Sequence, residues 1–180
     1  MVYVFLANGF EEMEALSPVD ILRRAKIEVK TVGIGSKTVM GSHNIPVVCD
    51  ITEDEVSFDN LEGIILPGGM PGTLNLEKNK TVNEFIDYSQ RNGLIIGAIC
   101  AAPSILGHKG LLKGKKATCF NGFEKELEGA VIVEKPAVTD KNIVTGWGAG
   151  GAFDFAFAYL TALTNDSENT EKLRLSVRYN

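Results

Sequence analysis

The sequence lacks the features that mark membrane proteins and nucleic-acid-binding proteins. Its apolar runs stay short of the ~20 residues that a membrane-spanning helix requires, and the run over residues 2–6 is also too short for a signal peptide. The formal net charge is −5, which argues against the basic face that nucleic-acid phosphates attract. We therefore expect a cytoplasmic protein that binds neither a membrane nor nucleic acid.

Histidine and cysteine are also scarce. The chain has two histidines and three cysteines, and Cys49, Cys100 and Cys119 lack the paired short spacings of disulfide frameworks and zinc sites. His43 falls near a predicted hairpin turn, and His108 follows Cys100 by eight residues, roughly 12 Å along the same predicted helix. We expect both histidines at the surface and no Cys-His-Asp triad within one subunit. The other two cysteines are most simply packing residues.

Motifs for cofactors are absent too. The glycine-rich stretch 146–151 has neither the Lys-Ser/Thr pair of a P-loop nor the Gly-x-Gly-x-x-Gly spacing of a dinucleotide site. Its glycines are better explained by close packing at the start of the helix that follows. We expect no bound cofactor and no metal.

Apolar β-branched runs alternate with segments of helical periodicity along the chain. With 180 residues, 44% of them hydrophobic, the sequence fits one globular domain over residues 1–180. The alternation predicts an α/β fold, with a mostly parallel sheet and helices on both of its faces. We expect strands at 2–6, 27–34, 63–66, 94–99, 117–120, 131–133, 137–139 and 142–145, a hairpin within 38–49, and helices at 82–89, 152–163 and 168–177.

An acidic cluster, Glu11, Glu12 and Glu14, follows the first predicted strand. Acids in a first helical turn complement the helix dipole, which is sufficient to explain Glu11 and Glu12. If Glu14 is buried beside a thiol, its pKa rises and the carboxyl can donate a hydrogen bond to a thiolate. Two helix starts remain open here: Ser17 as N-cap before Pro18, or a helix from about Glu11 that is kinked at Pro18.

Residues 94–107 are predicted to form an apolar strand followed by a helix, with one cysteine where the two meet. Cys100 stands at the junction, and the small residues Ala98 and Ala102 on either side permit the sharp turn of a nucleophile elbow. The N-terminus of the helix is expected to lower the pKa of the Cys100 thiol and favour its thiolate. The alternative is a structural cysteine, because free cysteine is among the most buried residue types.

These features converge on one edge of the predicted sheet. The acidic cluster, the loop 67–72 and Cys100 all follow parallel strands at their carboxyl ends, where sites collect in open α/β sheets. Gly68 and Gly69 can serve merely as a tight turn. In the functional alternative, the backbone N–H of Gly69 and that of Ala101 form an oxyanion hole.

Several segments resemble the ThiJ/PfpI superfamily, and within it the branch of the parkinsonism-associated deglycase and YajL. The resemblance covers nearly the whole chain and is carried by GFEEME (9–14), SPVDILRRA (17–25), LPGG (66–69), AICAAP (98–103) and GAGGAFDF (148–155). It implies a flavodoxin-like, doubly wound fold and a homodimer. It also implies a reactive elbow cysteine at Cys100, a protonated glutamate at Glu14, and an oxyanion pocket formed by the amides of Gly69 and Ala101 beside Gly68.

Two departures from the superfamily pattern narrow the function. PfpI-like proteases have a histidine directly after the elbow cysteine, where this chain has Ala101, so peptidase activity is the least supported reading. Human-type members have a histidine at the position of Phe120, which leaves Glu14 as the only proton carrier for Cys100. We therefore expect a cofactor-independent enzyme of the glyoxalase III or deglycase type, acting on methylglyoxal-like aldehydes or their early adducts. The alternative is an oxidative-stress sensor or chaperone that forms a sulfinic acid at Cys100.

Overall fold

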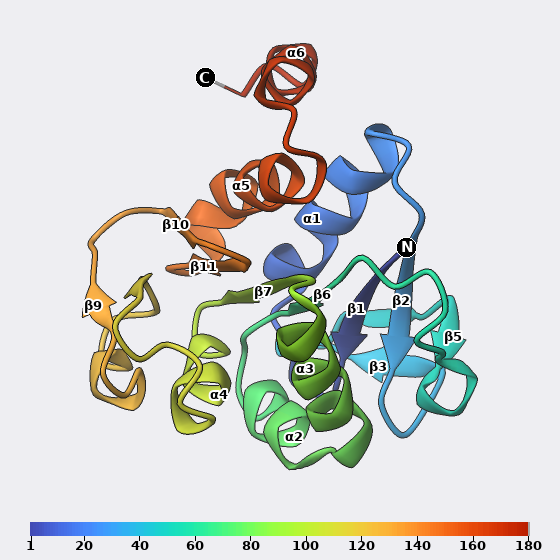
Figure 1. Cartoon of the computed structure of the whole chain (residues 1–180). Coiled ribbons are helices and arrows are strands. Elements are labelled where there is room, and N and C mark those ends of the chain that lie inside the picture. Colours follow the sequence, from blue (N-terminus) through green and yellow to red (C-terminus); the bar gives the residue numbers. More distant parts are fainter. Residues whose placement is uncertain (180) are drawn as a thin grey trace.

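The computed structural model describes residues 1–179, which are organised around a seven-stranded sheet (Figure 1). The strand order is β10-β11-β7-β6-β1-β2-β5, with β10 antiparallel to β11 and the other neighbours parallel. These strands are β1 (Val2–Leu6), β2 (Val29–Gly33), β5 (Ile51–Thr52), β6 (Gly63–Leu66), β7 (Ile95–Ile99), β10 (Ala137–Asp140) and β11 (Ile143–Gly146). The predicted α/β fold with a mostly parallel sheet is confirmed.

Helices cover both faces of this sheet, as Figure 1 shows. One face is covered by α1 (Glu12–Arg24) and α5 (Ala152–Thr164), with α6 (Ser167–Ser176) packed outside them. The opposite face is covered by α2 (Gly72–Lys78), α3 (Lys80–Asn92) and α4 (Pro103–His108). The remaining elements are the pairs β3 (Thr38–Met40) with β4 (Pro46–Val48) and β8 (Lys116–Ala117) with β9 (Val131–Ile132), and the short 3₁₀ helices η1 (Glu53–Glu55), η2 (Glu124–Glu126) and η3 (Ala149–Gly151).

Burial on both faces explains why the central strands are continuous apolar runs. All five residues of β1 are buried, and they alternate between the two cores: Tyr3 and Phe5 join the side of α3, whereas Val4 and Leu6 join the side of α1 and α5. A strand that is covered on both faces needs apolar side chains at every position. Within residues 1–179, none of the helices combines the length and apolar character needed to cross a membrane.

The structure settles the start of the first helix. α1 begins at Glu12, its N-cap is Glu11, and the Glu11 carboxylate accepts the backbone N–H of Glu14 at 2.8 Å. The alternative start at Ser17 is therefore wrong, and Pro18 lies inside the helix. Because proline has no N–H, Pro18 cannot close the helical hydrogen bond to the carbonyl of Glu14.

Two short elements were not predicted, and one predicted strand is shorter than expected. β5 and α2 have only two and seven residues, too few to show a clear period in the sequence. The strand expected at 117–120 ends at Ala117. Beyond it the chain turns toward the elbow, where the backbone N–H of Phe120 donates to the Cys100 carbonyl at 2.9 Å.

Candidate active site

Cys100 occupies a sharp turn between β7 and α4, as predicted. Its φ angle is +65°, in the left-handed region that costs a side-chain-bearing residue about 1–2 kcal/mol. The turn is held by the backbone N–H of Cys100, which donates to the Gly146 carbonyl of β11 at 2.9 Å. Ala98 and Ala102 are fully buried on either side. A strained backbone conformation that its neighbours hold in place is typical of functional sites.

Glu14 lies in the first turn of α1, and its side chain points into the elbow. Only 1% of its surface is exposed, and its Oε2 accepts the backbone N–H of Gly68 at 2.9 Å. Burial raises the pKa of Glu14 to about 7, against the lowering effect of its hydrogen bond with Cys100, while the charge of Glu11 raises the pKa further. A carboxyl with this pKa can hold or release a proton near neutral pH.

Gly68 and Gly69 let the backbone approach both groups closely. A Cβ on Gly68 would lie 2.5 Å from the Cβ of Cys100 and 2.7 Å from Oε2 of Glu14. Gly69 has a φ angle of +86°, and a Cβ there would lie 2.4 Å from the backbone nitrogen of Glu11. Both positions therefore require glycine, and the pair does more than form a turn.

The thiol of Cys100 faces two backbone N–H groups and one carboxyl. Burial and the charge of the Glu14 carboxylate raise the pKa of Cys100 to about 12, against the lowering effect of the Gly69 and Ala101 N–H groups. The Ala101 N–H at the start of the helical segment lowers this pKa, as predicted, but the net shift of the pKa is upward. α4 has only six residues, and its dipole is outweighed by burial together with a facing carboxylate.

Cys100 and Glu14 interact closely enough to titrate as a pair. With the proton on sulfur, the pair is a thiol and a carboxylate. With the proton on Glu14, the carboxylate charge disappears, and the N–H groups of Gly69 and Ala101 stabilise a thiolate. The site can therefore place a nucleophile and an acid side by side without a histidine.

Sequence reasoning missed the contribution of the segment that follows β11. The Ala149 N–H lowers the pKa of Glu14, and a Cβ on Gly148 would lie 3.9 Å from Oε1 of Glu14. The stretch 146–151 was expected to serve only as the start of a helix. Its inclusion among the motifs of the resemblance was the single signal that it belongs to the site.

The neighbourhood of Glu12 also differs from expectation. Glu12 is 5% exposed, and its two oxygens contact the backbone N–H and the Nδ1 of His43, each at 2.8 Å. Burial raises the pKa of Glu12, but the contacts with His43 outweigh it and lower that pKa. His43, expected far from this edge of the sheet, is thus bound to the start of α1. Glu11, Glu12 and His43 bring potential metal-ligand atoms within 4.8 Å of one another, and the hydrogen-bonded pair already accounts for this arrangement.

The remaining predicted residues lie away from the reactive pair. His108 is bound through Nδ1 to Glu77 at 2.5 Å and through Nε2 to Glu126 at 2.8 Å, so neither ring nitrogen serves Cys100. Cys49 and Cys119 are free, buried thiols in the two cores. Burial raises the pKa of each to about 11, which fits their predicted packing role.

Comparison with known proteins points to one family. A family model described as the DJ-1/PfpI family matches residues 1–162. Protein dj-1beta of Drosophila melanogaster is 32% identical over 181 residues, which cover 98% of this chain and 97% of the relative. Among solved structures, a cysteine-to-alanine mutant of a DJ-1 superfamily protein from Salmonella typhimurium is 36% identical, with a TM-score of 0.93 over 99% of this chain and 98% of its own. The oxidized form of Toxoplasma gondii DJ-1 is 30% identical, with a TM-score of 0.93 over 99% of this chain and 97% of its own. The chain therefore belongs to the DJ-1/PfpI family, as the resemblance of its motifs indicated.

Proposed function

We propose that the protein is a cytoplasmic, cofactor-independent enzyme of the glyoxalase III or deglycase type. Its substrates are methylglyoxal-like aldehydes or the early adducts that such aldehydes form with thiols and amines. The observation that carries the proposal is the position of Glu14, a buried carboxyl with a pKa raised to about 7 that lies with Cys100 against the Cα of Gly68. Such a pair supplies a nucleophile and a proton carrier in one place.

The proposed reaction is an isomerisation in which a proton moves between the two carbonyl carbons of methylglyoxal. The Cys100 thiolate adds to the aldehyde carbon of methylglyoxal, and the N–H groups of Gly69 and Ala101 hold the oxyanion, which Glu14 protonates. The Glu14 carboxylate then removes the proton from that carbon and returns it to the neighbouring ketone carbon, while the proton of the new hydroxyl passes to the ketone oxygen. The aldehyde carbon is oxidised and the ketone carbon is reduced within one molecule, so no external oxidant is needed. Water hydrolyses the resulting thioester to lactate and restores the thiol.

The test is the formation of lactate from methylglyoxal. Purified protein is expected to produce lactate well above a Cys100→Ser control, because serine lacks the thiolate. Equal lactate from both proteins would contradict the proposal. Peptide hydrolysis has less support, since Ala101 stands where the proteases of the superfamily have a histidine.

A second candidate function is oxidative sensing by Cys100. The thiol is only partly buried, and the N–H groups of Gly69 and Ala101 with a protonated Glu14 would stabilise the oxygens of a sulfinate. The related Toxoplasma gondii protein is described in an oxidized form. Peroxide treatment followed by intact mass distinguishes the two functions. A stable two-oxygen adduct confined to Cys100, without turnover of aldehydes, would favour the sensor or chaperone.

We propose that the protein forms a homodimer through α1 and the β3–β4 hairpin. Large apolar side chains are exposed on both elements, namely Met13, Leu16, Met40, Ile45 and Val48. The hairpin is fixed to α1 by the contacts between His43 and Glu12, which brings these side chains to one region of the surface. Light scattering should give a dimer for the parent chain and a monomer for Val48→Asp, since Val48 is 71% exposed. A monomeric parent chain would contradict this proposal.

A further inference from the structure

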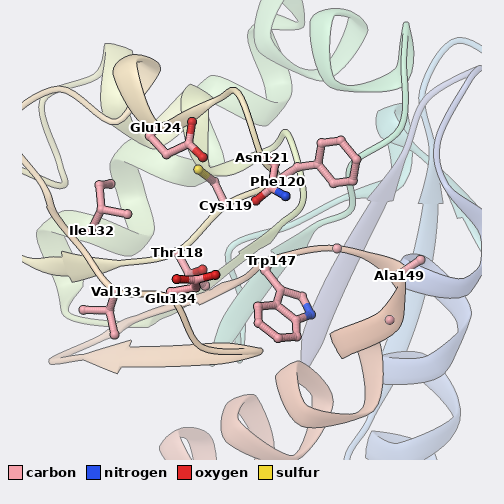
Figure 2. Close-up of a pocket in the computed structure, with 12 residues that line it drawn as sticks. Thr118, Cys119, Phe120, Asn121, Glu124, Ile132, Val133, Glu134, Trp147 and Ala149 are labelled. Atoms are coloured by element: carbon pink, nitrogen blue, oxygen red, sulfur yellow. The ribbon is translucent and has the colours of Figure 1, made fainter.

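A cavity of about 610 Å³ lies beside the elbow. Its lining comes from the segment after β8, the 3₁₀ helix η2, the end of β9 and the segment after β11, as Figure 2 shows. The lining residues are 118–121, Glu124, 132–134 and 147–150. The cavity is thus larger than methylglyoxal requires, and none of its residues has a role in the chemistry proposed above except Ala149.

The cavity shares a wall with the reactive pair. The backbone N–H of Phe120 donates to the carbonyl of Cys100 at 2.9 Å. A Cβ on Gly148 would lie 3.2 Å from the ring of Phe120 on one side and 3.9 Å from Oε1 of Glu14 on the other. The N–H of Ala149, which also lines the cavity, lowers the pKa of Glu14. The cavity therefore adjoins the reactive pair across Phe120 and Gly148.

The charged side chains that line the cavity are all negative. Two carboxylates, Glu124 and Glu134, belong to the lining, which includes no lysine, arginine or histidine. Within residues 1–179 neither carboxylate forms an ion pair, and Glu124 only accepts the backbone N–H of Gly122 at 2.9 Å. In Figure 2, both carboxylates stand between Ile132 and Val133 on one side and aromatic side chains on the other. The cavity therefore attracts cations and repels anions.

Two aromatic rings complete this environment. Phe120 is 52% exposed and Trp147 is 37% exposed, so each presents ring surface to a ligand. The indole of Trp147 packs against Gly151, where a Cβ would lie only 2.5 Å from Nε1, which fixes the ring on the cavity wall. Aromatic faces next to carboxylates are suited to guanidinium and ammonium groups through cation–π and charge interactions.

We propose that this cavity binds a cationic, partly apolar group attached to the carbonyl compound that reacts at Cys100. This inference rests on the proposed function and adds a selectivity to it. In an adduct, the Cys100 thiolate replaces the external thiol or amine on the former aldehyde carbon, and Glu14 protonates the group that leaves. The protein prefers carbonyl adducts with a guanidinium or ammonium group over neutral ones, and discriminates against anionic adducts. Glu124 and Glu134 determine this selectivity and take no part in the bond-making steps.

Binding can be measured without turnover, because Trp147 is the only tryptophan of the chain. Its fluorescence is titrated with n-butylguanidinium, with pentanamide as a neutral analogue and with pentanoate as an anionic one. The guanidinium should bind at least about threefold more tightly than the amide, and pentanoate should bind more weakly than either. The double variant Glu124→Gln and Glu134→Gln should remove the difference. Glu128→Gln is the matched control, since it removes one charge from an exposed residue outside the lining.

Turnover provides the second readout. Hemithioacetals of methylglyoxal with thiocholine, 2-mercaptoethanol and 3-mercaptopropionate differ chiefly in charge, and the quaternary ammonium group of thiocholine cannot cyclise onto the aldehyde carbon. We expect kcat/KM to fall in that order for the parent protein, and to become equal in the double variant with the neutral adduct unchanged. Equal binding of the three analogues, or equal turnover of the three adducts by the parent chain, would overturn the inference while leaving the proposed function intact. If no adduct is turned over, the proposed function fails, and the fluorescence titration alone decides whether the cavity selects cations.

Discussion

Gly68 donates its backbone N–H to Oε2 of Glu14 at 2.9 Å, and its Cα faces both reactive groups. The absence of a side chain at this position is what allows the Glu14 carboxyl and Cys100 to pack against the same backbone atom. A glycine in the loop after β6 thus connects the first turn of α1 to the elbow after β7.

Replacing Gly68 by alanine should destabilise the fold and disrupt the pair. The added Cβ would lie 2.5 Å from the Cβ of Cys100, which is fixed to the backbone, so the loop must move. We expect the free energy of unfolding, measured with urea, to fall by about 1–3 kcal/mol. Gly150→Ala is the control, because nothing lies within 4 Å of a Cβ at Gly150. Equal losses in the two variants would show that the close approach at Gly68 has no cost.

Replacing Glu14 by glutamine should remove catalysis and leave the fold in place. The amide oxygen of glutamine can still accept the N–H of Gly68, but the side chain can no longer transfer a proton. We expect kcat/KM for lactate formation to fall by about 10²–10⁴-fold. Glu12→Gln, a neighbouring buried carboxyl bound to His43, should retain most of the activity. Full activity of Glu14→Gln would exclude Glu14 as the proton carrier.

The same substitution should change the reactivity of the thiol. The charge of the Glu14 carboxylate is one of the causes that raise the pKa of Cys100 to about 12. Its removal in Glu14→Gln should shift the pH profile of Cys100 alkylation by iodoacetamide to lower pH. Intact mass confirms that Cys100 is the residue modified. An unchanged profile would mean that burial alone sets the pKa of the thiol.

Stability should depend on pH through Glu14. Its folded-state pKa of about 7 lies above the ordinary glutamate value of 4.5, so the folded protein holds this proton more tightly than the unfolded chain does. The stabilisation is complete below the unfolded pKa and is lost as the pH rises through the folded pKa, with a total of about 3 kcal/mol. The unfolding free energy of the parent minus that of Glu14→Gln should therefore fall as the pH rises from 4.5 to about 7, because only the parent loses this stabilisation. A difference that is constant over this range would contradict the raised pKa.

Removing the imidazole of His43 should weaken the fold. Glu12 is almost fully buried and relies on the backbone N–H and the Nδ1 of His43. His43→Ala removes the second contact and leaves the carboxylate less satisfied, so the midpoint of urea unfolding should fall relative to the parent protein. His108→Ala is a comparison at carboxylates that are more exposed, where the fall should be smaller. Unchanged stability of His43→Ala would show that the backbone N–H of His43 and the hydroxyl of Ser42, which donates to Oε2 at 3.3 Å, are enough for the Glu12 carboxylate.

The layers of the fold could be predicted because they follow from local patterns. The runs 2–6 and 63–66 are apolar throughout, which is typical of parallel strands covered on both faces, and both are β-strands in the structure. The turn at Cys100 could be predicted from its small neighbours. The sequence left two possible starts for α1 open, because Ser17 before Pro18 has the pattern of a capped helix start. Only tertiary packing places Pro18 inside the helix.

The parts of the site that escaped prediction depend on contacts between distant segments. Glu12 meets His43 across 31 residues of chain, and no local pattern encodes that contact. The pKa of Cys100 was predicted in the wrong direction because a helix dipole is a local feature, whereas burial and the Glu14 carboxylate come from other elements. Four separate segments line the cavity, so the gathering of two carboxylates without a basic residue can be recognised only in the folded chain.

The most direct test of the account is the fate of Cys100 during turnover. Methylglyoxal is mixed with the protein, and rapid quenching with intact mass follows the adduct while lactate is measured in the same samples. We predict an adduct of one methylglyoxal on Cys100 that decays as lactate appears, and that accumulates without lactate in Glu14→Gln. Lactate formed with no adduct on Cys100, or at the same rate in Glu14→Gln, would contradict the account.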